Sequence, residues 1–176
     1  FLDPTGETVS FGDLPSGDQD RKVFVVFSTE GKILSTPEFI PAHNRVETET
    51  EIKINDDETI FAGKDIVTYG FYNQSQRGWF KYTMPILIEE SLKAKVNQIV
   101  AGGKLLDYKI ENVSDMDKAI RLNYKFTGPE YLIRAGRARI IPPLGDIDLS
   151  AISKEKRNYN IDLEIRQQTE NIVIFE

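Results

Sequence analysis

The clearest pattern of hydrophobic and polar positions lies in the ten residues RVETETEIKI that begin at Arg45. Every second side chain from Val46 onward, whether Val, Thr or Ile, falls on one face, and the glutamates and Lys53 fall on the other. A period of two predicts a strand with one buried face and one solvated face. The following segment, Asn55–Glu58, has the Asn and Asp side chains that favour a turn.

The next stretch, TIFAGKDIVTY, is rich in β-forming residues and predicts a return strand that ends at Tyr69. Gly63 and Lys64 interrupt its alternation, which predicts a β-bulge at that point. A hairpin of this length needs a cover over its apolar face, so we expect it in the middle of a sheet.

Six further stretches have the composition or the alternation of strands. They are Lys22–Ser28, Lys104–Val113, Ala119–Phe126, Tyr131–Ile141, Tyr159–Ile165 and Asn171–Phe175. The first, KVFVVFS, is almost continuously apolar, which predicts a strand buried on both faces or beneath a neighbour. We expect the last two to pair with each other, and Ile147–Ile152 to form a short turn or edge strand.

Between these strands the hydrophobic period becomes helical. One apolar stripe recurs at Ile88, Leu92, Val96 and Ile99. Thr83 is the expected N-cap with Pro85 in the first turn, and a short preceding helix is expected to break at Gly78. We therefore expect an α+β fold, mainly antiparallel β, as a β-sandwich-like domain with one helical insertion at about residues 71–101.

Length, charge and composition narrow the class of protein. The 176 residues suit one domain, or one domain plus a piece of another. A net charge of -6 argues against nucleic acid or an anionic membrane surface as a partner. No apolar run approaches the roughly 20 residues of a membrane span, so none is predicted.

Residue types limit the chemistry. The chain has no cysteine, which excludes disulfides, thiolate zinc sites and a cysteine nucleophile within it. His43 is the only histidine, and a lone surface imidazole is the expected role. Neither the acidic turn Asp56–Glu58 nor the aspartates of residues 13–20 have the spacing of a calcium loop, so both are interpreted as solvated carboxylates. We expect no metal and no cofactor.

The first residues, Phe1-Leu2-Asp3-Pro4-Thr5, allow two interpretations. Asp-Pro-Thr suits an ordinary turn after a strand. The stretch LDPT also resembles the last catalytic strand of transglutaminase-like, papain-type cores. That resemblance implies that Asp3 is the triad carboxylate, which would hold an imidazole in one tautomer. The Cys and the His of such a triad would then lie upstream of Phe1.

The order of later segments extends the resemblance along nearly the whole chain. FGDLPSG, NRVETE, the helix, the paired strands and GPEYLIRAG…IIPP are similar in order to bacterial envelope proteins with a transglutaminase-like core and trailing β domains. The resemblance implies that residues 1–20 are the end of that core with a connecting loop. Residues 21–176 would be a β-rich accessory domain that continues beyond 176. The chain begins without Met, so we interpret it as part of a longer protein of the periplasm or cell envelope.

Two side-chain groups are candidates for binding. Trp79 and Tyr72 belong to an aromatic stretch that could stack on sugars or grip a peptide, although aromatics before a helix usually fill a sheet–helix interface. Arg137 and Arg139, expected on one strand face with Arg134 nearby, could hold a carboxylate or phosphate. Pairing with acids of the chain is the simpler interpretation, with the glutamates of the strand that contains Glu47 as candidates.

The leading expectation is thus a non-catalytic accessory domain that packs against the rest of its parent chain, the parent being a cysteine peptidase or acyltransferase. The alternative is an independent glycan- or peptide-binding β-sandwich module.

Overall fold

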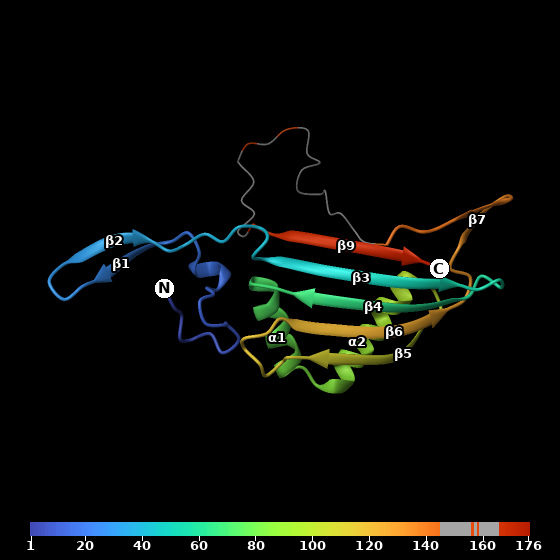
Figure 1. Ribbon diagram of the computed structural model, residues 1–176, viewed down its shortest axis with the longest axis horizontal. Coiled ribbons are helices and arrows are strands. Elements are labelled where there is room, and N and C mark those ends of the chain that lie inside the picture. The colour runs from blue at the N-terminus through green and yellow to red at the C-terminus, as the bar shows by residue number, and fades with distance from the viewer. Residues whose placement is uncertain (145–155, 157, 159–165) are drawn as a thin grey trace.

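The computed structural model describes residues 1–144, 156, 158 and 166–176, and is built on one five-stranded sheet (Figure 1). In space the strands run β5–β6–β4–β3–β9. Their bounds are β3 Arg45–Ile54, β4 Ile60–Thr68, β5 Lys104–Glu111, β6 Ile120–Gly128 and β9 Gln168–Phe175. All neighbours are antiparallel except β3 and β9, which are parallel.

The β3–β4 hairpin occupies the middle of this sheet, as its alternation predicts. Its pairing runs without interruption from Ile54↔Ile60 to Val46↔Thr68. The bulge predicted at Gly63 and Lys64 is therefore wrong. The irregularity lies in β5, where the register shifts between Leu105 and Asp107. An extra residue in an edge strand disturbs only one ladder, which is where bulges are common.

Two helices cover one face of the sheet, α1 Phe71–Tyr82 and α2 Pro85–Ile99 (Figure 1). The first runs unbroken through Gly78, contrary to the predicted break. Thr83 ends α1 instead of capping α2, and Met84 takes the N-cap position with Pro85 next to it. The mainly antiparallel α+β class is confirmed. Helices, and not the second sheet expected for a sandwich, form the covering layer.

The core fills the space between the helices and the sheet. Its buried members come from β3, β4, β6, both helices and the segments next to them. They are Ile52, Ile60, Ala62, Phe80, Ile88, Leu92, Val96, Val100, Ile120, Leu122, Tyr124, Phe126 and Tyr131. The predicted helical stripe is thus buried, apart from Ile99, which is partly buried against the core. Burial raises the pKa of the Tyr124 phenol to about 12.

A two-stranded ribbon, β1 Lys22–Val26 paired with β2 Gly31–Ser35, stands apart from the sheet (Figure 1). The prediction that KVFVVFS is buried on both faces is wrong. Phe24, Val26 and Ile33 are 68%, 75% and 71% exposed. The continuous apolar run therefore marks an uncovered ribbon and not a central strand.

A second ribbon forms where one strand was predicted over Tyr131–Ile141. It consists of β7 Ile133–Ala135 and β8 Ala138–Ile140. Gly136, with a φ of 63°, lies in the left-handed region and turns the chain between them.

The C-terminal strand forms as predicted, and its partner among the described residues is β3. β9 runs parallel to β3, from Arg45↔Gln168 to Ile52↔Phe175. The strand predicted at Tyr159–Ile165, and its pairing with β9, lie outside the described residues, as does the short element predicted at Ile147–Ile152.

Candidate functional site

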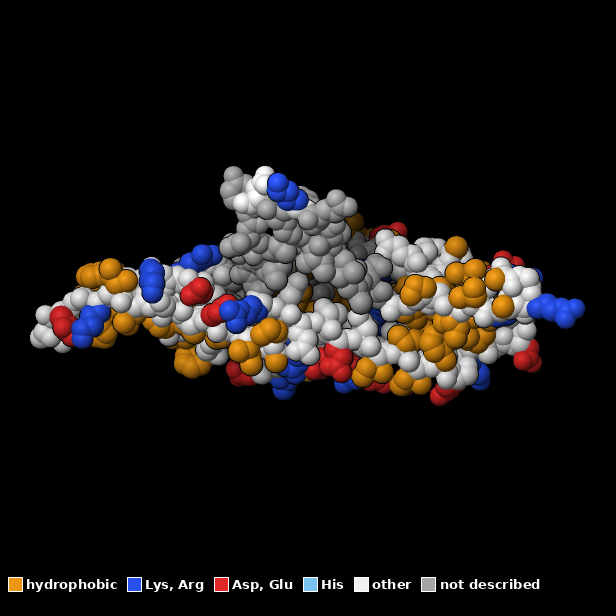
Figure 2. All heavy atoms as spheres, turned by 90° about the horizontal axis from the view of Figure 1, so that it is seen from above, with side chains coloured by type: hydrophobic (Ala, Val, Ile, Leu, Met, Phe, Trp, Pro, Cys, Tyr) orange, Lys and Arg blue, Asp and Glu red, His pale blue; other side chains and the backbone are white. Residues whose placement is uncertain are grey.

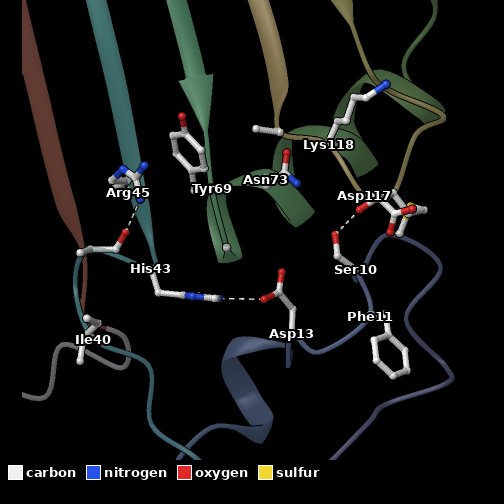
Figure 3. A pocket seen from close by; sticks show the side chains of 14 residues that line it. Ser10, Phe11, Asp13, Ile40, His43, Arg45, Tyr69, Asn73, Asp117 and Lys118 are labelled. Carbon is white, nitrogen blue, oxygen red and sulfur yellow. Dashed lines mark hydrogen bonds and ion pairs between the residues drawn. The ribbon is translucent and has the colours of Figure 1, made fainter.

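A cleft of about 500 Å³ lies at the α1 end of the sheet (Figure 3). Four segments line it: Ser10–Asp13, Ile40–Arg45, Tyr69–Asn73 and the β5–β6 turn at Met116–Ala119. Because these segments are far apart in sequence, no short sequence motif predicts the cleft. Its volume lies in the range of small-ligand sites.

His43 and Asp13 form one wall of the cleft (Figure 3). The Nε2 atom of His43 lies 2.7 Å from Oδ1 of Asp13, and the imidazole also stacks near the ring of Phe39, with centroids 4.3 Å apart. Because a carboxylate only accepts hydrogen bonds, the proton lies on Nε2 and the ring is fixed in orientation. The expectation of a lone imidazole missed this partner, which the tertiary fold brings from 30 residues away.

Arg45 and Tyr69 form the adjoining wall. The guanidinium lies over the Tyr69 ring, 3.8 Å from its centroid, and its Nε donates to Glu47 at 2.6 Å. The Tyr69 hydroxyl donates to the same carboxylate at 2.9 Å. The hydrogen bond from Arg45 is the main cause that lowers the pKa of Glu47, so this ion pair is intact at neutral pH.

Asn73, on α1, lies at the floor of the cleft and is only 6% exposed. Its Oδ1 accepts a hydrogen bond of 2.8 Å from the backbone N–H of Ile120. Its Nδ2 has no acceptor among the described residues. Buried amides usually have hydrogen-bond partners for their donors. The two N–H donors of Asn73 are therefore available to a molecule that fills the cleft.

Two further buried polar side chains of α1 hold the walls in place. Gln74 donates to the carbonyl oxygen of Leu14 at 3.3 Å and so anchors the N-terminal segment. Arg77, 1% exposed, donates from Nη1 to the carbonyl oxygens of Asn112 and Val113 and from Nη2 to that of Lys118, at 2.6, 2.7 and 2.9 Å. These bonds fix the β5–β6 turn.

Asn44 joins the start of α1 to the loop before β3. Its Oδ1 accepts from the N–H of Phe71 at 3.0 Å, and its Nδ2 donates to the carbonyl oxygen of Arg166 at 3.1 Å. Gly70 has a φ of 56°, and a Cβ there would lie 2.5 Å from both Asn44 Oδ1 and the carbonyl oxygen of His43. The cleft therefore needs a glycine at this junction.

Asp3, the predicted triad carboxylate, lies in a local turn. Its Oδ1 accepts from the backbone N–H and the hydroxyl of Thr5, at 2.9 and 2.6 Å. The hydroxyl bond is the larger cause that lowers the Asp3 pKa. The cleft does not include Asp3, and its triad role stays a prediction that rests on the resemblance.

The aromatic candidates do not form an exposed platform. Trp79 is partly buried, packs against the core and lies 4.9 Å from the Phe80 ring between centroids. Tyr72 is also partly covered and donates its hydroxyl proton to Gln167. The simpler interpretation, aromatics that fill the helix–sheet interface, describes Trp79.

The three arginines Arg134, Arg137 and Arg139 are also arranged differently from the prediction. Arg134 and Arg139 lie opposite each other across β7 and β8, and both bind Glu58 in the β3–β4 turn, at 3.0 and 2.6 Å. Arg137 lies in the turn of the ribbon, not on a strand face with Arg139. Pairing with an acid was the expectation for the row, but the partner is Glu58 instead of the β3 glutamates.

The cleft lacks the geometry of a hydrolase triad among the described residues. The Ser10 hydroxyl donates to the Met116 carbonyl at 2.7 Å and is not hydrogen-bonded to His43. No group of three or more potential ligands is placed to hold a metal in the part of the chain that the structure describes. Within the same residues, none of the helices has the length and apolar character to cross a bilayer.

Comparison with family models, with curated proteins and with solved structures gave no match for this chain. The transglutaminase-like resemblance therefore rests on the sequence motifs alone.

Proposed function

We propose that this chain is a non-catalytic accessory domain of a periplasmic or secreted transglutaminase-like protein, and that it packs against the rest of that protein through the β1–β2 ribbon. The proposal joins the LDPT resemblance to one structural observation, the uncovered apolar surface of the ribbon.

The ribbon carries apolar side chains on both faces. Phe24, Val26 and Ile33 belong to one face, and Val23, Val25 and Leu34 to the other. An isolated two-stranded ribbon is marginally stable in water, and exposed apolar patches of this kind usually mark contact surfaces. Figure 2 shows hydrophobic side chains on the surface at the β1–β2 end of the molecule. A neighbouring domain over the ribbon would remove this surface from water.

The segment before the ribbon is held firmly on the domain. Leu14 is buried, and its carbonyl oxygen accepts from both Gln19 and Gln74. Glu7 pairs with Lys81 at 3.0 Å and accepts a hydrogen bond from Tyr82, both at the end of α1. A chain that enters through this segment arrives in a defined direction, beside the ribbon. This arrangement favours a rigid junction with a preceding domain.

The experiment compares this chain with a form extended upstream of Phe1 in the parent gene by roughly one hundred residues, a usual domain length. We expect the added sequence to contain a Cys that opens a helix and a His on the strand before LDPT. Backbone amides of β1 and β2 should exchange with deuterium at least about tenfold more slowly in the extended form, because the ribbon is then covered.

The β7–β8 ribbon is the internal control, since its amides should exchange at the same rate in both forms. Absence of the Cys or the His, or unchanged exchange in β1 and β2, would contradict the proposal.

A second candidate function is binding of a glycan or peptide by the domain itself. The partly buried Trp79 does not favour the surface first expected for it. The cleft favours this second function, because the amide of Asn73 presents unused donors at its floor.

A further inference from the structure

We propose that the cleft binds a neutral carbohydrate of one or two sugar units. The inference deepens the second candidate function by naming its ligand class, and it is independent of the accessory-domain proposal.

The charges around the cleft favour an uncharged ligand. Each basic side chain that lines it already contacts an acid: His43 with Asp13, Arg45 with Glu47, and Lys118 with Asp115 at 2.8 Å. Asp117 also lines the cleft and forms no ion pair among the described residues. A phosphate or carboxylate would meet basic side chains that already hold an acid, together with the carboxylate of Asp117, which repels an anion.

The hydrogen-bonding groups suit hydroxyls. Asn73 offers donors at the floor, whereas the carboxylates of Asp117 and Asp13 and the Ser10 oxygen offer acceptors. Figure 3 shows Ser10 and Asp117 on one side of the cleft and His43 and Arg45 on the other. Asn73 lies between these two sides. A sugar hydroxyl both donates and accepts, so a ring bearing several hydroxyls can satisfy both kinds of group at once.

The rim supplies an apolar contact. Phe11 is 87% exposed and lines the mouth of the cleft. A phenyl ring beside planar polar side chains can cover the C–H face of a pyranose while those side chains bind its edge. Apolar and aromatic side chains with a few placed polar groups around one concave site are the usual composition of a small-ligand pocket.

A peptide fits this cleft less well. Extended peptides commonly add a strand to an open sheet edge. The strand that reaches the cleft, β3, is paired on both sides, with β4 and with β9, and Arg45 itself faces Gln168. No backbone edge of β3 is therefore available to a peptide beside Arg45.

The test is an NMR titration of the full 176-residue chain, uniformly labelled with ¹⁵N, with three neutral probes: methyl α-D-glucopyranoside, methyl β-D-galactopyranoside and N,N′-diacetylchitobiose. Sodium glucuronate, inorganic phosphate and trialanine are the comparison probes. We expect at least one neutral sugar to give saturable shifts at the Asn73 side-chain amide, Phe11 and Asp117 at concentrations up to tens of millimolar. The charged probes and trialanine should not shift these signals.

Three variants locate the site. Phe11→Ala and Asp117→Asn change exposed side chains and should weaken sugar binding by about tenfold each. Asn73→Asp keeps an oxygen for the Ile120 N–H but removes the donors, and should abolish binding. Phe24→Ala, an exposed phenylalanine on the β1–β2 ribbon, is the matched control and should bind like the native chain.

Failure of all three sugars to bind overturns the proposal. So does preferential binding of phosphate, glucuronate or trialanine, or sugar binding that survives both Phe11→Ala and Asp117→Asn. None of these results affects the deuterium exchange of the β1–β2 ribbon, so the two proposals fail separately.

Discussion

Arg77 of α1 donates a hydrogen bond of 2.9 Å to the carbonyl oxygen of Lys118, in the turn that forms one wall of the cleft. The same guanidinium binds the carbonyl oxygens of Asn112 and Val113, so one side chain fixes both ends of the β5–β6 turn. Its Nε has no partner among the described residues, and burial lowers the pKa of the guanidinium. The position of this wall therefore depends on a residue that does not line the cleft.

Replacement of Arg77 should destabilise the domain and loosen that turn. Arg77→Met removes three hydrogen bonds and leaves partly buried carbonyl oxygens without this donor, which we expect to cost about 3 kcal/mol of unfolding free energy. Urea unfolding followed by the fluorescence of Trp79, the single tryptophan, measures the loss. Lys81→Met, at an exposed position of the same helix, should cost far less. Equal stability of Arg77→Met and the native chain would mean that the β5–β6 turn does not depend on the Arg77 hydrogen bonds.

Gly70 should not tolerate alanine. A Cβ at this residue meets Asn44 Oδ1 and the His43 carbonyl at 2.5 Å, and the φ of 56° strains any L side chain. Gly70→Ala should lower the unfolding free energy by about 2 kcal/mol or more. The matched control is Gly63→Ala, where a Cβ has open space, and it should be neutral or stabilising by up to about 1 kcal/mol. Similar losses in thermal unfolding for both variants would contradict the strain argument.

The ion pairs of Glu58 should make stability fall at acid pH. Hydrogen bonds from Arg139 and then Arg134 lower the pKa of this carboxyl below its ordinary value of 4.5. A depressed carboxyl pKa contributes stability that is present above pH 4.5 and is lost as the pH falls through the folded-state value. We expect Glu58→Gln to flatten the acid limb of a Tm-against-pH curve.

Glu51→Gln is the control for this effect, because its carboxylate forms no ion pair among the residues that the structure describes. It should leave the acid limb unchanged. If Glu58→Gln retains the full acid limb, the Arg134 and Arg139 pairs contribute nothing measurable.

Lys64 should be a destabilising residue at neutral pH. It faces the helices from β4, opposite the buried Tyr124, and has no hydrogen-bond partner among the described residues. Burial, with a smaller effect of Lys95, lowers its pKa, so native stability should rise as the pH increases from the folded-state value towards 10.5. Lys64→Met should raise the Tm at pH 7 by a few degrees and remove that rise.

Lys125→Met, on the solvated face of β6, is the comparison and should have little effect on either quantity. A lower Tm for Lys64→Met at pH 7 would show that the ammonium has a stabilising partner.

The sequence by itself determined the elements whose cause is local. The alternation in RVETETEIKI predicted β3 and its buried face, and the stripe at Ile88, Leu92 and Val96 predicted α2. The α+β class follows from these two periods, because the burial of an alternating face or a helical stripe depends on the spacing of side chains along one element.

Tertiary structure decided what depends on partners distant in sequence. The continuous apolar run KVFVVFS is compatible with a central strand or an uncovered ribbon, and only the placement of its neighbours distinguishes the two. The parallel pairing of β9 with β3 and the helical cover of the sheet are further choices among arrangements with the same local pattern. The cleft belongs to this class as well. His43 meets Asp13, and Asn73 meets Ile120, only because the folded chain brings together segments that no local spacing relates.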